Sequence, residues 1–164
     1  MIKIGDALPD ATVFESTEFG DSCPLAPQKL SVADLARGKR IVAFGLPGAF
    51  TPTCSAKHVP GYLDNLDALK QKGVDEVWCL AVNDGFVMAA WGQDLDAIGK
   101  IRMLGDGSAE LTKKLGLDTE IPGMGVRSRR FSLLIEQGVV KRVNVEESGK
   151  FTVSNAETML EQLG

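Results

Sequence analysis

The sequence contains few side chains able to carry out chemistry: three cysteines, Cys23, Cys54 and Cys79, and one histidine, His58. Zinc sites and thioredoxin-type redox pairs use closely spaced ligands such as Cys-x-x-Cys, whereas these cysteines lie 31 and 25 residues apart. A Ser-His-Asp hydrolase would have to use His58, and the sequence lacks the G-x-S-x-G motif of such enzymes. It also lacks the G-x-x-x-x-G-K-[ST] motif of phosphate-binding loops. We therefore expect any chemistry to belong to a cysteine, without a metal or other cofactor.

Cys54 lies at the start of a predicted helix, directly after a turn that begins at Pro47. Thr51 suits the N-cap and Pro52 the first helical position, which places Cys54 in the first turn. Backbone N–H groups there lack intrahelical partners and, with the positive end of the helix, favour the nucleophilic thiolate. The segment predicts a reactive sulfur. The same segment also suits a purely structural interpretation, in which Cys54 is a small buried side chain without reactivity. Thr51 would then only cap the helix, and Pro47 would only shape the turn.

Alternating strands and helices must position this turn. Ile41–Leu46 and Glu76–Val82 are continuous apolar runs, typical of strands buried on both faces. A helical pattern runs from Thr53 to Lys72, and Pro60-Gly61 predicts a kink in it, because proline cannot donate a backbone hydrogen bond. Further strands are predicted at Thr12–Glu15, Ile101–Leu104, Phe131–Glu136 and Val139–Val145, and further helices starting at Ser31, Asp84, Asp106 and Ser154, the last with a capping box. This order predicts one domain over residues 1–164, a three-layer α/β fold with a mixed sheet.

The composition narrows the classes of partner. The chain carries a net charge of −4 and a sequence pI near 5.1, whereas nucleic-acid and membrane-surface proteins normally present a basic face. Residues Met1–Asp6 lack the apolar core of a signal peptide, and no apolar run approaches the ~20 residues of a membrane span. We expect a cytoplasmic protein that binds neither nucleic acid nor membrane.

The segment from Pro47 to Cys54 resembles the P-x-x-x-T-x-x-C active-site motif of peroxiredoxins. With Ser55, Lys57-His58 and Pro60-Gly61, the string is similar to the type II, or peroxiredoxin-5-like, subfamily. Three later segments resemble the same subfamily and follow in the same order: Ala81–Asp84, Ala90–Gly92 and Gly123–Phe131. The resemblance therefore spans essentially the whole chain.

The resemblance implies a thioredoxin-like fold, reduction of hydrogen peroxide and alkyl hydroperoxides, and a homodimer. It implies that Cys54 is the nucleophile and becomes a sulfenic acid. Thr51 would form a hydrogen bond with the peroxide oxygens, and Pro47 would shield the thiolate from water. Arg130, immediately before the strand at Phe131, would supply a fixed positive charge to the sulfur and the peroxide.

Several of these side chains also have a simpler interpretation. His58 lies four residues after Cys54 and could act as a base, but no partner that would orient it is recognisable in the sequence. Arg127 and Arg129 suit a solvated or salt-bridged cluster, and spacing alone does not distinguish them from Arg130. Trp91 suits packing or a subunit interface better than catalysis.

Cys79 suits a buried core position, although type II members often have a cysteine there, so that a resolving role stays open. Animal-type members place a resolving cysteine near the start of the final helix, where this chain has Ser154 and no cysteine follows Cys79. Recycling by an external thiol is therefore expected, with glutathione and glutaredoxin ahead of thioredoxin. Cys23, in a predicted loop, has no assigned role. The alternatives are a redox-sensing or binding module that relays oxidation to a partner and, last, a Cys-His hydrolase or transferase.

Overall fold

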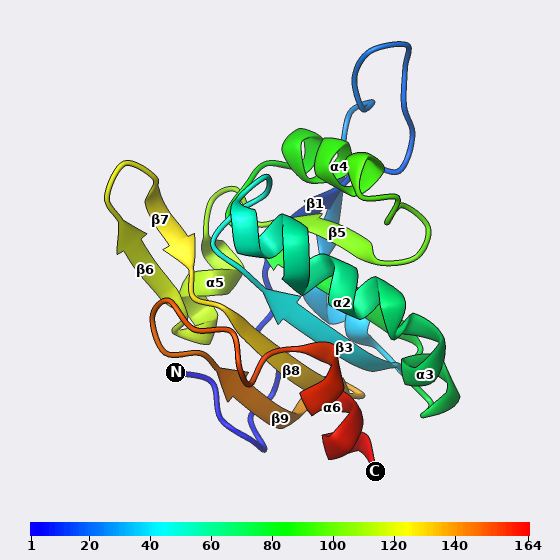
Figure 1. Ribbon diagram of the computed structural model, residues 1–164, viewed down its shortest axis with the longest axis vertical. Helices are drawn as coiled ribbons and strands as arrows, with labels where there is room; N and C mark the ends of the chain where they lie inside the picture. Colours follow the sequence, from blue (N-terminus) through cyan, green and yellow to red (C-terminus); the bar gives the residue numbers. More distant parts are fainter.

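A seven-stranded sheet forms the centre of the structure, a computed structural model that describes residues 1–164 (Figure 1). In this sheet β3, β4 and β5 are parallel, and all other neighbouring strands are antiparallel, which confirms the predicted mixed sheet. The strand order is β2-β1-β5-β4-β3-β8-β9, with bounds β1 Thr12–Glu15, β2 Gln28–Ser31, β3 Arg40–Gly45, β4 Glu76–Ala81, β5 Arg102–Gly105, β8 Phe131–Glu136 and β9 Val139–Val145.

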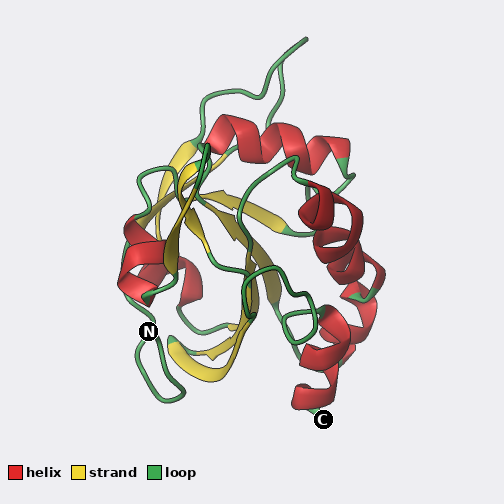
Figure 2. Cartoon of the chain, turned by 60° about the vertical axis from the view of Figure 1, so that its left-hand side comes forward, coloured by secondary structure: helices red, strands yellow, loops and turns green.

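Helices cover both faces of the sheet and complete the predicted three-layer architecture (Figure 2). Successive residues of β3 alternate between two buried clusters, Val42 and Phe44 on one face and Ile41 and Ala43 on the other. Because both faces are covered, this strand has no polar side. The first face carries α2 (Val59–Asp64), α3 (Leu66–Gln71), α4 (Gly85–Asp94) and α6 (Ala156–Leu163), and the second carries α1 (Val32–Ala36) and α5 (Glu110–Leu115). No helix is long and apolar enough to span a bilayer.

The prediction of one helix over 53–72, kinked at Pro60-Gly61, is wrong in detail, because the structure has a π-helical turn followed by two short helices there. Residues Cys54–His58 form a π-helical turn, η1, in which the N–H of Val59 donates to the carbonyl of Cys54, five residues earlier. Pro60 follows in the first turn of α2, where its missing N–H costs little. The break falls instead at Asn65, whose side-chain amide donates to the carbonyl of Gly61 at 2.8 Å.

Three strands were not predicted from the sequence: the edge strand β2 and the two strands of a separate hairpin. The edge strand β2 is short and half-exposed, so its residues show no apolar alternation. The separate hairpin consists of β6 (Asp118–Ile121) and β7 (Gly125–Ser128), and Gly123 between them has a φ of +80°. The other helices begin as predicted at Ser31 and Asp84, which cap α1 and α4, whereas α5 begins at Glu110, later than the start predicted at Asp106.

The pairing of β3 with β8 brings two distant parts of the chain together. The two strands are antiparallel, with Gly45 at the end of β3 opposite Phe131 at the start of β8. The residues that follow Gly45 therefore emerge at the same sheet edge as Arg130, which directly precedes Phe131. This register depends on a close contact, because a Cβ on Gly45 would lie 2.1 Å from Cε1 of Phe131.

Replacing Gly45 by alanine is expected to lower the free energy of unfolding by about 1–3 kcal/mol, since the added methyl group overpacks the Phe131 ring. Gly61→Ala is the control: it lies in α2, where an added Cβ meets no atom within 4 Å. Helix propensity predicts that this change leaves stability unaltered or raises it by up to about 1 kcal/mol. Urea denaturation measures both, and equal losses in the two variants would contradict the packing argument.

Candidate active site

The turn after β3 is built from side-chain and backbone hydrogen bonds. The N–H of Ala49 donates to Oδ1 of Asn83 at 2.9 Å, and Phe50 has a φ of +61°. Thr51 Oγ1 donates to the carbonyl of Gly48 at 2.7 Å, so this hydroxyl closes the turn. It does not cap the helix, which differs from the prediction. Because its proton is committed to Gly48, the Thr51 oxygen offers lone pairs to a ligand.

Cys54 lies in the first helical turn, as predicted, with its side chain completely buried. The N–H of Ser55 donates to the carbonyl of Thr51, an ordinary helical bond at the start of the segment. The closest polar partner of the sulfur comes from the other side of the β3–β8 edge: Nη2 of Arg130 donates to Sγ of Cys54 at 3.3 Å. The structure thus brings a permanent cation against the predicted nucleophile.

Arg127 and Arg129 are partly exposed and form no ion pair, so the salt-bridged form of the expected cluster is not present. Nη1 of Arg127 donates to the carbonyls of Pro47 and Val82, at 3.4 and 3.3 Å, and so ties β7 to the turn. Nη2 of Arg129 donates to the carbonyl of Glu146 at 3.1 Å. Both guanidinium groups therefore serve backbone carbonyls, because the fold places those acceptors closer than any carboxylate.

His58 is buried between two partners on different elements. Its Nδ1 lies 2.9 Å from Nη1 of Arg130, and its Nε2 lies 3.1 Å from the carbonyl oxygen of Ser154. A guanidinium only donates, so Nδ1 accepts and Nε2–H donates to Ser154. Burial and, second, the charge of Arg130 lower the pKa of His58 to about 3. The imidazole is therefore neutral, and the lone pair of Nδ1 is occupied by the bond from Arg130, which contradicts a role as a free base. Through this bond His58 orients the Arg130 guanidinium.

Ser154 is not the capping residue predicted for the last helix. Its hydroxyl donates to Oε2 of Glu146 at 2.7 Å, and Asn155 is the N-cap of α6. The helix begins one residue later than predicted, so the Ser154 hydroxyl lies outside the cap position and forms its hydrogen bond with the carboxylate instead. The carbonyl of Ser154 accepts from both His58 and the Tyr62 hydroxyl, at 3.1 and 2.8 Å.

A cleft of about 910 Å³ adjoins the site, and Arg130 is one of the residues that line it. Pro47, Thr53 and Lys57 from the Cys54 segment also line this cleft, whereas Cys54 and Thr51 do not. Phe151 is a further lining residue, and its ring centroid lies 5.8 Å from Cζ of Arg130. The structure contains no group of three or more His, Cys, Asp or Glu side chains placed to hold a metal ion.

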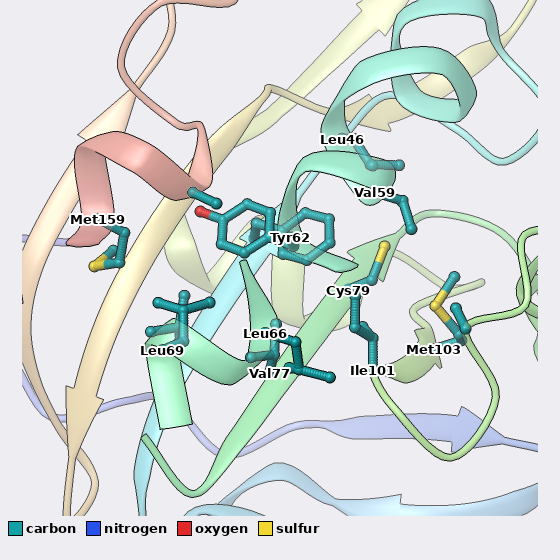
Figure 3. Close-up of a cluster of buried hydrophobic side chains, with 14 of the residues drawn as sticks. Leu46, Val59, Tyr62, Leu66, Leu69, Val77, Cys79, Ile101, Met103 and Met159 are labelled. Carbon is teal, nitrogen blue, oxygen red and sulfur yellow. The ribbon is translucent and has the colours of Figure 1, made fainter. Parts of the chain in front are cut away.

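The other two cysteines have very different surroundings. Cys79 is fully buried on β4 beside Val59, Ile101 and Met103, and that burial raises the pKa of its thiol well above the usual value (Figure 3). Cys23 is exposed in the β1–β2 loop, which extends away from the sheet (Figure 1). All three thiols are free.

Trp91 is also fully buried, and its indole N–H donates to Ser55 Oγ at 3.0 Å. Of the two roles considered for Trp91, packing is therefore the one that the structure supports.

His58 makes folding stability depend on pH in a defined window. Its pKa is about 3 in the folded chain and about 6.5 for an exposed histidine. Between these values the unfolded chain binds a proton that the folded chain does not, so the free energy of unfolding falls as the pH drops below about 6.5. The expected slope approaches one proton, on the order of 1 kcal/mol per pH unit.

Urea denaturation between about pH 7 and pH 5, above the carboxylate range, measures this slope. His58 is the only histidine, so His58→Gln should abolish the pH dependence in that window. An unchanged slope in the variant would contradict the assignment of a buried, neutral imidazole.

The geometry has close counterparts among known proteins. Residues 3–160 match the Redoxin family model. Peroxiredoxin-2B of Arabidopsis thaliana is 48% identical over 164 residues, covering 99% of this chain and 98% of that protein. The crystal structure of reduced Prx3 in complex with H₂O₂ from Vibrio vulnificus has a TM-score of 0.93 and 45% identity, with 100% of both chains covered. Peroxiredoxin 5 from Alvinella pompejana has a TM-score of 0.85 and 34% identity, covering 99% of this chain and 98% of that one.

These matches include the helix–turn segment of Cys54 and the β8 edge that carries Arg130. They support the thioredoxin-like fold with its central mixed sheet. The chain belongs to the Redoxin family and, within it, to the peroxiredoxins, which are thiol-dependent peroxidases.

Proposed function

We propose that Cys54 is the residue that attacks the peroxide, and that Arg130, Thr51 and Pro47 form its immediate surroundings. The observation that carries this assignment is the 3.3 Å hydrogen bond from Arg130 Nη2 to Cys54 Sγ. Cys54 is the one cysteine of the three that has a cationic donor and a position in a first helical turn. Both features favour the thiolate, which is the nucleophilic form.

In the proposed reaction the Cys54 thiolate attacks one oxygen of the hydroperoxide and the O–O bond breaks. The sulfur gains that oxygen and becomes a sulfenic acid, while the other oxygen leaves as hydroxide or alkoxide and takes up a proton. Arg130 donates to the developing negative charge, which is where a fixed donor lowers the barrier. Thr51, whose own proton goes to Gly48, accepts a hydrogen bond from the peroxide O–H.

The protein is further proposed to be of the type II, peroxiredoxin-5-like kind and to be recycled by an external thiol. The 34% identity to peroxiredoxin 5 of Alvinella pompejana supports the subtype. The burial of Cys79 supports external recycling, since a thiol inside the core meets the oxidised Cys54 only after local rearrangement. Glutathione with glutaredoxin is proposed as the reductant ahead of thioredoxin. A cytoplasmic location stays a prediction.

A homodimer is proposed as the working state. Two exposed aromatic side chains support it, Phe50 on the turn and Phe86 on α4, at 56% and 49% exposure. The Ala49–Asn83 hydrogen bond joins the two segments that carry them, so both lie near the same turn. Sedimentation velocity of the protein tests this state, and a monomer at all concentrations would contradict it.

Removing the proposed nucleophile should abolish the fast reaction with peroxide. Stopped-flow measurement on the reduced protein should show no fast phase for Cys54→Ser, while Cys79→Ser and Cys23→Ser retain it. Arg130→Gln should slow the phase by ~10²–10³-fold, because a donor to the developing charge is lost. Full activity in Cys54→Ser together with its loss in Cys79→Ser would overturn the assignment.

The recycling step is tested by oxidising the protein with one equivalent of hydrogen peroxide and mapping each cysteine by mass spectrometry. A sulfenate confined to Cys54, followed by sustained turnover with glutathione and glutaredoxin, is the expected result. A disulfide between Cys54 and Cys79 would contradict an external thiol as the resolving group. A single burst of oxidation without turnover, whatever thiol is supplied, would favour the alternative of a redox-sensing module.

A further inference from the structure

Glu146, which follows β9, is a buried carboxylate that pairs with no cation. Glu146 is only 3% exposed, and no lysine or arginine forms an ion pair with its carboxylate. Its partners are instead donors of one short segment. Oε2 accepts from the N–H groups of Thr152, Val153 and Ser154, each at 2.8 Å, and from the Ser154 hydroxyl at 2.7 Å.

The second oxygen of Glu146 completes this arrangement. Oε1 accepts from the N–H and the hydroxyl of Thr152, at 3.0 and 3.3 Å. Burial by itself would raise the pKa of Glu146, but the bonds from Thr152, Ser154 and Val153 outweigh it and hold that pKa below its usual value. The carboxylate is therefore ionised and holds three consecutive residues by their backbone and side-chain donors.

The segment held by Glu146 contacts the back of the active site. Its last residue, Ser154, presents the carbonyl that receives Nε2–H of His58, and His58 Nδ1 receives Nη1 of Arg130. Phe151, which directly precedes the segment, lies near both: its ring centroid is 4.9 Å from the His58 ring centroid, with the two rings tilted, and 5.8 Å from Arg130 Cζ. Glu146 also adjoins Arg130 through the backbone, since its N–H donates to the Arg130 carbonyl at 2.9 Å.

These contacts form one continuous series of hydrogen bonds from Glu146 to the sulfur. The carboxylate sets the position of the Ser154 carbonyl, that carbonyl sets the tautomer and tilt of His58, and His58 leaves Nη2 of Arg130 directed at Cys54. In metal sites, partners that orient a ligand from outside commonly change affinity or activity about 10–100-fold when they are removed, and we expect an effect of the same order here. A neutral side chain at 146 would leave the N–H groups of 152–154 without a full set of acceptors.

We propose that Glu146 is a positioning residue of the peroxidase, which aims Arg130 at Cys54 through Ser154 and His58. The inference rests on the proposed role of Cys54 and Arg130. It assigns a part in the reaction to Glu146 and to the segment 152–154 that Glu146 holds, although the side-chain hydrogen bond to the sulfur comes from Arg130.

The test compares Glu146→Gln with Glu147→Gln in the full-length protein. Glu147 is the exposed neighbour of Glu146, and its carboxylate pairs only with Lys150 at 2.6 Å. Both changes remove one negative charge from the same loop, so the two variants have the same net charge and differ in whether the buried or the exposed carboxylate is lost. Glu146→Gln should slow the single-turnover reaction of reduced protein with hydrogen peroxide about 10–100-fold, and Glu147→Gln should leave it within about twofold of wild type.

A second measurement separates positioning from a purely structural role. Alkylation of Cys54 by iodoacetamide, followed across pH in the folded protein, should shift to higher pH in Glu146→Gln, because Arg130 no longer stabilises the thiolate as well. A structural role alone would lower the thermal midpoint but leave both the alkylation profile and the peroxide rate of the folded protein unchanged. That outcome would overturn the proposal.

If Glu146→Gln does not fold, the variant Thr152→Val with Ser154→Ala takes its place. It removes both hydroxyl donors to Glu146 and keeps the charge, the backbone N–H bonds and the Ser154 carbonyl. A several-fold slower peroxide reaction with a shifted alkylation profile supports the proposal, and wild-type values in the folded double variant overturn it. A wild-type protein that fails to consume peroxide would instead contradict the proposed function itself.

Discussion

The hydrogen bond between the Arg130 guanidinium and the Cys54 sulfur imposes the main constraint on this fold, because it requires a permanent cation beside a fully buried thiol. Such a cation is costly to bury unless its donors are satisfied. Nη2 is directed at the sulfur and Nη1 at the neutral imidazole of His58. Arg130 also lines the cleft and lies 5.8 Å from the Phe151 ring centroid, so this residue connects the buried sulfur with the open cleft.

The sheet makes this contact possible by its register. Cys54 and Arg130 are 76 residues apart, and the antiparallel β3–β8 pair brings the residues after Gly45 and those before Phe131 to one edge. Gly45 allows the Phe131 ring to lie over the end of β3. Arg127 then ties the turn to the β6–β7 hairpin through the carbonyl of Pro47. Each of these contacts connects elements that are far apart along the chain.

The three cysteines illustrate how surroundings decide the chemistry of one residue type. Cys54 and Cys79 belong to the same buried cluster, yet only Cys54 receives a hydrogen bond from a cation. Cys79 has apolar neighbours, and burial raises the pKa of its thiol, which favours the protonated form. Cys23 is exposed and lies on a loop with no cationic donor. The surroundings therefore support the proposal that Cys54 is the nucleophile.

The layered α/β architecture follows from the sequence alone, because strands buried on both faces are continuously apolar and the helices between them cover those faces. The sequence also placed Cys54 in a first helical turn through the local preferences of Thr51 and Pro52, although the Thr51 side chain closes a turn instead of capping. Spacing and charge did not distinguish Arg127, Arg129 and Arg130; the family resemblance pointed to Arg130, and the folded chain places its guanidinium 3.3 Å from the sulfur. Only the tertiary structure decided that His58 orients Arg130 and that the hydroxyl of Ser154 serves Glu146, because these hydrogen bonds join residues whose proximity depends on strand register and not on local sequence.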